Sequence, residues 1–179
     1  MRRPAPAESG LANSPAVDPA VDPAVGPAVG PSLRAKALAW LAQREHSTLE
    51  LRGKLQRWAQ SRGRDAAAEG LEALLEALQA AGHLSDTRFA HSRVHTRAPR
   101  LGNLRIEHEL RRNGVSPDEA LRQVLRASEL ERARAVWARR FGRPAADLAE
   151  RARQARFLAG RGFSADTIGR VIGADPSAD

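Results

Sequence analysis

Apolar residues recur every three or four positions along most of this chain, which is the spacing of one face of an α-helix. Between residues 82 and 125 the pattern predicts three helices. The first follows residues 85–86 and stops near Pro99, the second runs over about 102–112, and the third begins at Ser116. Helices of roughly 10 to 12 residues are marginal in water because nucleation is costly. We therefore expect these helices to pack on one another and on their neighbours.

Residues at the expected helix ends favour this division. Ser and Asp at 85–86 can each accept the free N–H groups of a helix start, and Asn-Gly at 113–114 is typical of a left-handed stop. Ser116 and Glu119 form a predicted capping box, with Pro117 at the first helical position. The expected core positions are Phe89, Ala90, Val94, Ile106, Leu110, Ala120, Leu121, Val124 and Leu125.

A similar set of three helices is predicted before this stretch. Ser32 caps a helix over about 33–44, and Ser47 with Glu50 forms a capping box that opens the next helix. The third helix of this set covers 66–81. The expected core positions are Leu33, Ala37, Trp40, Leu41, Leu51, Leu55, Trp58, Leu71, Leu74, Leu75 and Leu78.

The pattern returns a third time, with helices predicted over about 129–141, over about 146–160 and up to about Gly173. Gly162-Phe163-Ser164 matches Gly114-Val115-Ser116, which lies 48 positions earlier. The expected core positions of this set are Leu130, Ala133, Trp137, Phe141, Ala155, Leu158, Ala159, Ile168 and Ile172.

These patterns predict an all-α protein of three tandem three-helix repeats. Such repeats bury their apolar faces against the next unit, so we expect an elongated, curved rod. Alternating runs typical of strands are nearly missing. The expected parts are a disordered tail over 1–32, repeats over 33–82, 83–128 and 129–173, and a short tail over 174–179.

The expected N-terminal tail has its own repeat. Residues 16–31 read AVDP, AVDP, AVGP and AVGP, and proline at every fourth position is incompatible with a helix or a sheet ladder. We expect a disordered or extended segment. Composition favours a neutral extension over the alternative of a docking peptide.

The overall composition narrows the classes of protein. The chain has no cysteine, which excludes disulfides and fits a reducing compartment. No window approaches 18 apolar residues, as a membrane span requires, and no secretory signal is recognisable. We expect a cytoplasmic protein without membrane contact.

The chain is strongly basic, with 29 Lys and Arg against 21 Asp and Glu and a net charge of +8. Lys36 and Lys54 are its lysines, and the other basic residues are arginines. This excess predicts an acidic partner, either nucleic acid or an acidic protein groove. The alternative is an arginine-rich composition that reflects genome base content and forms solvated faces.

Signals of catalysis are missing. The chain has no G-x-x-x-x-G-K-[ST] sequence for phosphate binding. His91 and His95 are spaced i, i+4, but no glutamate follows His91 and a zinc site needs three or four ligands. We therefore expect no enzyme, no metal and no cofactor.

Two lines of cationic residues remain as candidates for binding. Neither contains an acidic residue, whereas Arg111 has Glu107 four positions before it and is expected to pair with it. The planar guanidinium suits both phosphates and carboxylates; a solvated helix face is the alternative for each residue. The lines are Arg105, His108 and Arg112 at i, i+3 and i+7, and nearby Arg93, Arg97 and Arg100. Weaker candidates are Arg132, Arg139 and Arg143 in the third set, and Lys54 and Arg57 in the first.

Three stretches resemble the signatures of a known family. Residues 41–55 contain an Arg, a Ser and then Glu-Leu-Arg-x-Lys-Leu, which resembles the first-repeat signature of the RecX family. Residues 82–90 are similar to its Gly-x-Leu-[ST]-Asp-x-x-[FY]-Ala junction, and residues 105–115 to its Ile-x-x-Glu-Leu-x-x-x-Gly-[IV] element. The resemblance extends over about 33–173, and the proline repeat lies outside it.

This resemblance implies a modulator of the RecA recombinase. Members of the family are built of three three-helix repeats, bind in the groove of the RecA–DNA filament, and inhibit strand exchange and ATP hydrolysis without a known catalytic centre. The implied partners are the RecA filament and, weakly and electrostatically, single- and double-stranded DNA. We expect a monomer.

Two other functions stay open. A nonspecific nucleic-acid binder that acts without RecA would show a steep salt dependence. A helix-turn-helix reader of DNA would use residues 109–125, but its second helix would enter the groove with Asp118 and Glu119 foremost, and these carboxylates repel phosphates.

Overall fold

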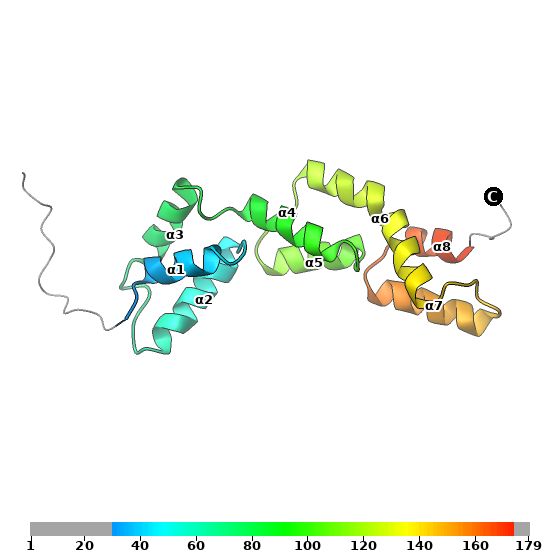
Figure 1. Ribbon diagram of the computed structural model, residues 1–179, viewed down its shortest axis with the longest axis horizontal. Coiled ribbons are helices and arrows are strands. Elements are labelled where there is room, and N and C mark those ends of the chain that lie inside the picture. Colours follow the sequence, from blue (N-terminus) through cyan, green and yellow to red (C-terminus); the bar gives the residue numbers. More distant parts are fainter. Residues whose placement is uncertain (1–29, 174–179) are drawn as a thin grey trace, which may run out of the picture. The chain divides into compact units, whose positions relative to one another are not determined.

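The computed structural model describes residues 30–173, and within them it contains α-helices and no strand (Figure 1). The predicted all-α class is therefore confirmed. Residues 1–29, which hold most of the predicted proline-repeat tail, and residues 174–179 lie outside the described part. The helices are α1 (Leu33–Leu41), α2 (Thr48–Gln60), α3 (Leu71–Ala80), α4 (Asp86–Arg97), α5 (Asn103–Arg112), α6 (Glu119–Arg140), α7 (Leu148–Gly160) and α8 (Ala165–Gly173).

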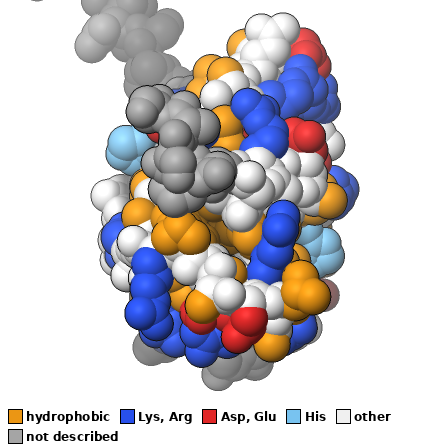
Figure 2. Space-filling view, turned by 90° about the vertical axis from the view of Figure 1, so that its right-hand side faces the viewer, with side chains coloured by type: hydrophobic (Ala, Val, Ile, Leu, Met, Phe, Trp, Pro, Cys, Tyr) orange, Lys and Arg blue, Asp and Glu red, His pale blue; other side chains and the backbone are white. Residues whose placement is uncertain are grey.

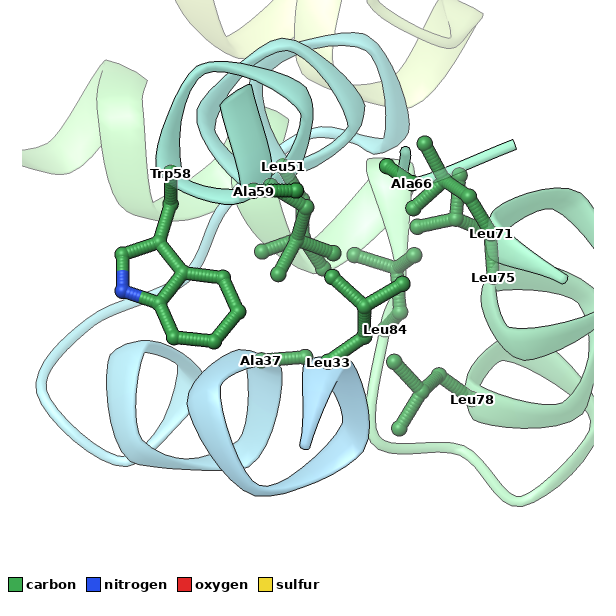
Figure 3. Close-up of a cluster of buried hydrophobic side chains, with 11 residues drawn as sticks. Leu33, Ala37, Leu51, Trp58, Ala59, Ala66, Leu71, Leu75, Leu78 and Leu84 are labelled. Atoms are coloured by element: carbon green, nitrogen blue, oxygen red, sulfur yellow. The ribbon is translucent and has the colours of Figure 1, made fainter. Parts of the chain in front are cut away.

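The first core lies between α1, α2 and α3 (Figure 3). Leucines of all three helices make up most of it, and the larger Trp58 side chain lies at one side. The Ser32 hydroxyl accepts the Ala35 N–H at 3.2 Å, and Ser47 accepts the Glu50 N–H at 3.0 Å. Both predicted caps are confirmed, whereas the Glu50 carboxylate of the predicted capping box accepts from Arg44. The third helix begins at Leu71 rather than at Ala66, because the chain turns through residues 66–70.

The second core is formed by α4, α5 and the first half of α6. Ser85 caps α4 by accepting the Arg88 N–H at 3.3 Å, and Gly114 has a left-handed φ of 71° after α5. Both ends were predicted. The buried apolar residues are Phe89, Ala90, Val94, Ile106, Leu110, Val115, Leu121 and Leu125.

The start of α6 was predicted wrongly. The helix begins at Glu119, and Asp118 caps it by accepting the Leu121 N–H at 2.7 Å. The predicted capping box of Ser116 is therefore absent, because residues 115–118 form a loop in which Val115 and Pro117 are buried, and Asp118 accepts the N–H group at the helix start instead. The later start also changes the inward face. Ala120 is exposed, and Val124 is 61% exposed instead of buried.

The break predicted between residues 125 and 129 is also wrong. α6 is one helix of 22 residues. It contains no glycine or proline, the residues that commonly end a helix, and its buried stripe continues without interruption. That stripe passes from Leu121 and Leu125 in the second core to Ala133 and Val136 in the third. A single helix thus supplies both cores.

The third core joins the second half of α6 to α7 and α8. Ala133, Leu158 and Phe163 are its most deeply buried members. Phe141 meets Phe157 edge to face at 5.3 Å between ring centroids. α7 begins at Leu148, where the Asp147 carboxylate accepts the Glu150 N–H at 2.7 Å.

The second and third cores meet through direct backbone contact. The Gly102 N–H donates to the Arg161 carbonyl at 2.9 Å, and the Leu104 N–H donates to the Gly162 carbonyl at 3.1 Å. A Cβ atom on Gly102 would lie 2.2 Å from the Gly162 oxygen, and one on Gly162 would lie 2.5 Å from the Cβ of Arg105. Glycine is therefore needed on both sides of this contact.

A buried carboxylate supports the same junction. Glu129 is 6% exposed and accepts the Asn103 N–H at 3.0 Å with one oxygen. Its other oxygen accepts the hydroxyls of Ser164 at 2.8 Å and Thr167 at 3.0 Å. A buried charge is tolerated when its hydrogen bonds are satisfied, so Glu129 joins the start of α5 and the start of α8 to the middle of α6.

The first prediction concerns the glycine contact. Gly102→Ala forces a methyl group against the backbone of Gly162, and overpacking of this kind costs roughly 1–3 kcal/mol. We expect a fall of that size in the free energy of unfolding, measured by urea denaturation. Gly169→Ala is the control, since a Cβ there meets no atom within 4 Å and alanine favours a helix interior by about 0.5–1 kcal/mol. Equal stability of the two variants would contradict the contact.

The second prediction concerns His46, which is 1% exposed. Its Nδ1 lies 3.0 Å from the Arg44 carbonyl, and its Nε2 lies 2.9 Å from the Lys54 ammonium. Nδ1 therefore donates and Nε2 accepts, which fits a neutral ring. Burial lowers the pKa of His46, against the opposing effect of the Arg44 carbonyl.

A histidine with a lowered folded pKa stabilises the protein fully above its unfolded pKa of about 6.5, and loses this contribution as the pH falls below it. We expect the free energy of unfolding to fall between about pH 7 and pH 5 more in the wild type than in His46→Gln, which keeps polar groups but does not titrate. The subtraction removes the effect of the other histidines and carboxylates. Parallel curves would rule out this role for His46.

Candidate functional site

The cationic line of α5 is exposed to solvent. Arg105, His108 and Arg112 are all exposed, and within residues 30–173 none of them pairs with a carboxylate. The expected ion pair between Arg111 and Glu107 is present at 3.6 Å. The outer face of α5 therefore carries positive charge that the described part of the chain leaves without acidic partners.

The second line, on α4 and the loop after it, is less uniform. The Arg97 guanidinium pairs with Glu109 of α5 at 3.2 Å, so part of its charge is neutralised. The Arg93 guanidinium lies 5.2 Å from the centroid of the Phe89 ring and is half-buried. Arg100 is exposed in the loop after α4. Sequence spacing could not show the pairing of Arg97, because its partner lies on another helix.

Arg132 does not belong to an exposed face, contrary to the sequence interpretation. Its guanidinium is half-buried and donates to the carbonyls of Leu101 at 2.6 Å, Leu125 at 3.0 Å and Ala98 at 3.3 Å. Burial lowers the pKa of Arg132, against the attraction of Glu129. Because these acceptors occupy its donors, Arg132 holds the loop after α4 onto α6.

Lys54 also contributes to packing. Its ammonium lies 2.9 Å from the His46 ring nitrogen and 4.3 Å from the centroid of the Trp40 ring, and burial lowers the pKa of Lys54. Arg57 is exposed and has no carboxylate partner in the described residues. Of this pair, Arg57 is the one that a binding partner can reach readily.

Two predicted candidates come together with two arginines that the sequence did not single out. Arg100 and Arg139 line a cleft of about 280 Å³ with Arg140 and Arg161. Arg140 follows Arg139 directly, which was a usable signal, whereas Arg161 reaches the cleft only because of the fold. Arg143 does not line this cleft.

Figure 2 shows basic side chains spread in separate groups among apolar ones on one face of the molecule. Charge is therefore distributed over this face instead of forming one continuous basic patch. The described residues contain no group of three or more His, Cys, Asp or Glu side chains placed to hold a metal ion. Among residues 30–173, no helix has both the length and the apolar character needed to cross a membrane.

Comparison with known proteins gives two family matches. Residues 85–125 match the second three-helix domain of RecX, and residues 127–172 match its third three-helix domain. These regions contain the second and third cores, with α6 crossing from one to the other.

Relatives that match most of the chain agree with these two family matches. The chain is 50% identical over 152 residues to the regulatory protein RecX of Ralstonia nicotianae, covering 83% of this chain and 91% of that protein. It is 48% identical over 143 residues to the regulatory protein RecX of Leptothrix cholodnii, covering 79% and 87%.

Solved structures show the same fold at lower identity. The crystal structure of RecX from Lactobacillus salivarius superposes with a TM-score of 0.60 and 19% identity, covering 79% of this chain and 92% of that one. Another crystal structure of a regulatory protein RecX gives a TM-score of 0.61 at 20% identity, covering 79% and 74%. Together with the sequence identities, this agreement shows that the chain belongs to the RecX family of regulatory proteins.

Proposed function

We propose that this protein binds in the groove of the RecA–DNA filament and inhibits its recombinase and ATPase activities, which limits recombination and DNA-repair responses. Family membership supports the regulatory role. The observation that carries the proposal is the exposed cationic face of α5, formed by Arg105, His108 and Arg112 without acidic partners among the described residues. A filament of DNA and protein offers phosphates and carboxylates that guanidinium groups bind well.

The proposed mechanism is mechanical and uses no catalytic group. Tandem repeats over 33–82, 83–128 and 129–173 form a curved rod that lies along the groove and bridges neighbouring RecA subunits. Occupying the groove blocks the incoming duplex and the subunit motions that accompany ATP turnover. The protein acts as a monomer in the cytoplasm, and its contacts with single- and double-stranded DNA are weak and electrostatic.

A continuous helix suits this mechanism. Because α6 supplies both the second and the third core, a load applied to one core is carried to the other through backbone hydrogen bonds. The Gly102 contact and the Glu129 hydrogen bonds act in parallel with it. The second and third cores are thus joined by the helix, by backbone hydrogen bonds and by a buried side chain, which supports the proposed obstruction of subunit motions.

A nonspecific nucleic-acid binder that acts without RecA is the second candidate, favoured by the four-arginine cleft. Helix-turn-helix reading of DNA is disfavoured by the start of α6. The Asp118 carboxylate caps that end, and Glu119 accepts from Arg122 and Arg126. Acidic groups at the end that would enter the groove repel phosphates.

The third prediction tests the regulatory role directly. Titrating the full chain into RecA on single-stranded DNA should reduce ATP hydrolysis in a saturable way, because bound protein restrains the filament subunits. The measurement is steady-state ATP turnover at fixed RecA and DNA. Unchanged turnover at a large excess of the protein would refute the proposal, and DNA binding without inhibition would favour the second candidate.

The fourth prediction tests the cationic face of α5. The double variant Arg105→Ala and Arg112→Ala should raise the concentration for half-maximal inhibition roughly tenfold or more, since each lost charge-assisted hydrogen bond costs on the order of 1 kcal/mol. Arg122→Ala with Arg126→Ala removes the same charge from arginines that already pair with Glu119 and serves as the control. Full inhibition by a folded Arg105 and Arg112 variant would show that the contact face lies elsewhere.

A further inference from the structure

Four arginines from three elements surround one cleft between the second and third cores. Arg100 comes from the loop after α4, Arg139 and Arg140 come from the last turn of α6, and Arg161 follows α7. Val136 and Phe157 complete the lining, and the cleft has a volume of about 280 Å³.

Their positive charge is not balanced nearby. No acidic side chain lines the cleft, and within residues 30–173 none of the four arginines pairs with a carboxylate. On the same helix, by contrast, Arg126 pairs with Glu119 and Arg134 with Glu131. Like charges around one concavity repel each other and focus a positive potential, which a bound anion relieves.

Two of the guanidinium groups are held in place by carbonyl oxygens. Arg139 donates to the Pro99 carbonyl at 2.9 Å and to the Ala135 carbonyl at 3.2 Å. Arg161 donates to the Arg100 carbonyl at 3.2 Å and lies 4.7 Å from the centroid of the Phe157 ring. Carbonyl acceptors fix a guanidinium without cancelling its charge, so these cations are ordered before any ligand arrives.

The hydrogen bonds of Arg139 and Arg161 have an alternative explanation, which is that they satisfy free carbonyl groups at the C-terminal end of α4. Arg139 and Arg161 satisfy carbonyls that follow the helix, and cations at a helix C-terminus are favourable without a ligand. That explanation does not cover Arg100 and Arg140. Within residues 30–173 the Arg100 side chain has no hydrogen bond, ion pair or ring contact. The Arg140 guanidinium lies 5.9 Å from the centroid of the Phe141 ring and has no other such contact.

We propose that the cleft lined by Arg100, Arg139, Arg140 and Arg161 binds consecutive phosphate groups of a nucleic-acid strand. The inference rests on the proposed function and deepens it, since it assigns this cleft to the DNA of the filament and not to the recombinase. A strand carries one charge on the outside of its backbone at every nucleotide. It can therefore present several anions to one concavity.

A protein partner is less suited to the same place. To bring several carboxylates into about 280 Å³, it would have to insert a loop together with its own backbone. The apolar walls of Val136 and Phe157 instead fit the sugar that connects two phosphates. Arginine forks bind phosphate oxygens in pairs, which gives affinity without reading sequence.

The test measures strand binding by the full chain without RecA. Fluorescence anisotropy follows a labelled single-stranded oligonucleotide, and in a second arm its duplex, over a series of salt concentrations. The cleft variant is Arg100→Gln with Arg140→Gln. These two positions are chosen because the wild-type arginine side chains donate no hydrogen bond in the described structure. The matched control is Arg122→Gln with Arg134→Gln, which removes the same charge from ion-paired arginines of α6.

We expect the cleft variant to bind roughly tenfold more weakly at low salt. The slope of log K against log salt should become shallower by about 1.4 for the single strand, or about 1.8 for the duplex, as two phosphate contacts are lost. The arm with the larger loss identifies the form that the cleft holds. The control should keep the wild-type slope, and thermal unfolding confirms that each variant is folded.

Three results would overturn the inference. The first is an unchanged slope of log K against log salt in the cleft variant, and the second is an equal loss of strand affinity in the control variant. The third is displacement of the strand by tripolyphosphate at equal phosphate concentration, which would indicate that the cleft binds free phosphate. Binding of a labelled polyglutamate peptide that weakens only in the cleft variant, while strand binding is unchanged, would assign the cleft to an acidic protein. ATP turnover of RecA is measured separately. If the cleft variant still inhibits ATP turnover and its salt slope is unchanged, the proposed strand-binding cleft is refuted, but the proposed function is not.

Discussion

The backbone contact between residues 102–104 and 161–162 determines how the second and third cores meet. Two N–H groups of one segment donate to two carbonyls of the other, and neither glycine leaves space for a side chain. Glu129 accepts hydrogen bonds from both sides of the same junction. In the described residues no buried side-chain nitrogen or oxygen lacks a partner, so the junction is satisfied as fully as an ordinary core.

This junction also creates the cationic cleft. Fixing Gly102 against Arg161 brings the loop after α4 beside the ends of α6 and α7, where the arginines of three elements meet. The charge arrangement is therefore a product of packing, and the exposed line on α5 is a product of helical spacing alone. The sequence therefore indicated the whole line on α5 but only Arg100 and Arg139 of the cleft.

Much of the fold could be predicted because its signals are local. The helix faces followed from apolar spacing, and the caps at Ser32, Ser47 and Ser85 followed from side chains that reach their own helix start. The error at the start of α6 arose where two local signals competed. Ser116 and Asp118 are both residue types that cap helices, and in the structure Asp118 accepts the Leu121 N–H.

The candidate site was less predictable because charge pairing depends on distant residues. Arg97 pairs with Glu109 on the next helix, Arg132 is half-buried by the loop after α4, and Arg161 comes close to Arg100 through contacts that span the two cores. The exposed line on α5 was visible in advance, since its members and their acidic neighbours all lie on one helix. No spacing rule within a single helix could have revealed the other three relationships.

The loop after α4 gives a physical reason for arginine in place of lysine at three positions of this chain, Arg132, Arg139 and Arg161. Each carbonyl from residue 98 to residue 101 accepts a hydrogen bond from an arginine. Arg132 donates to the carbonyls of Ala98 and Leu101. Arg139 donates to that of Pro99, and Arg161 donates to that of Arg100. A guanidinium has five donors spread over a flat fork, so one edge can hold a carbonyl while another faces outward. An ammonium concentrates its charge at one point and offers no second edge. At this loop arginine is therefore explained by the shape of its guanidinium group, and the base content of the genome is not needed to explain it.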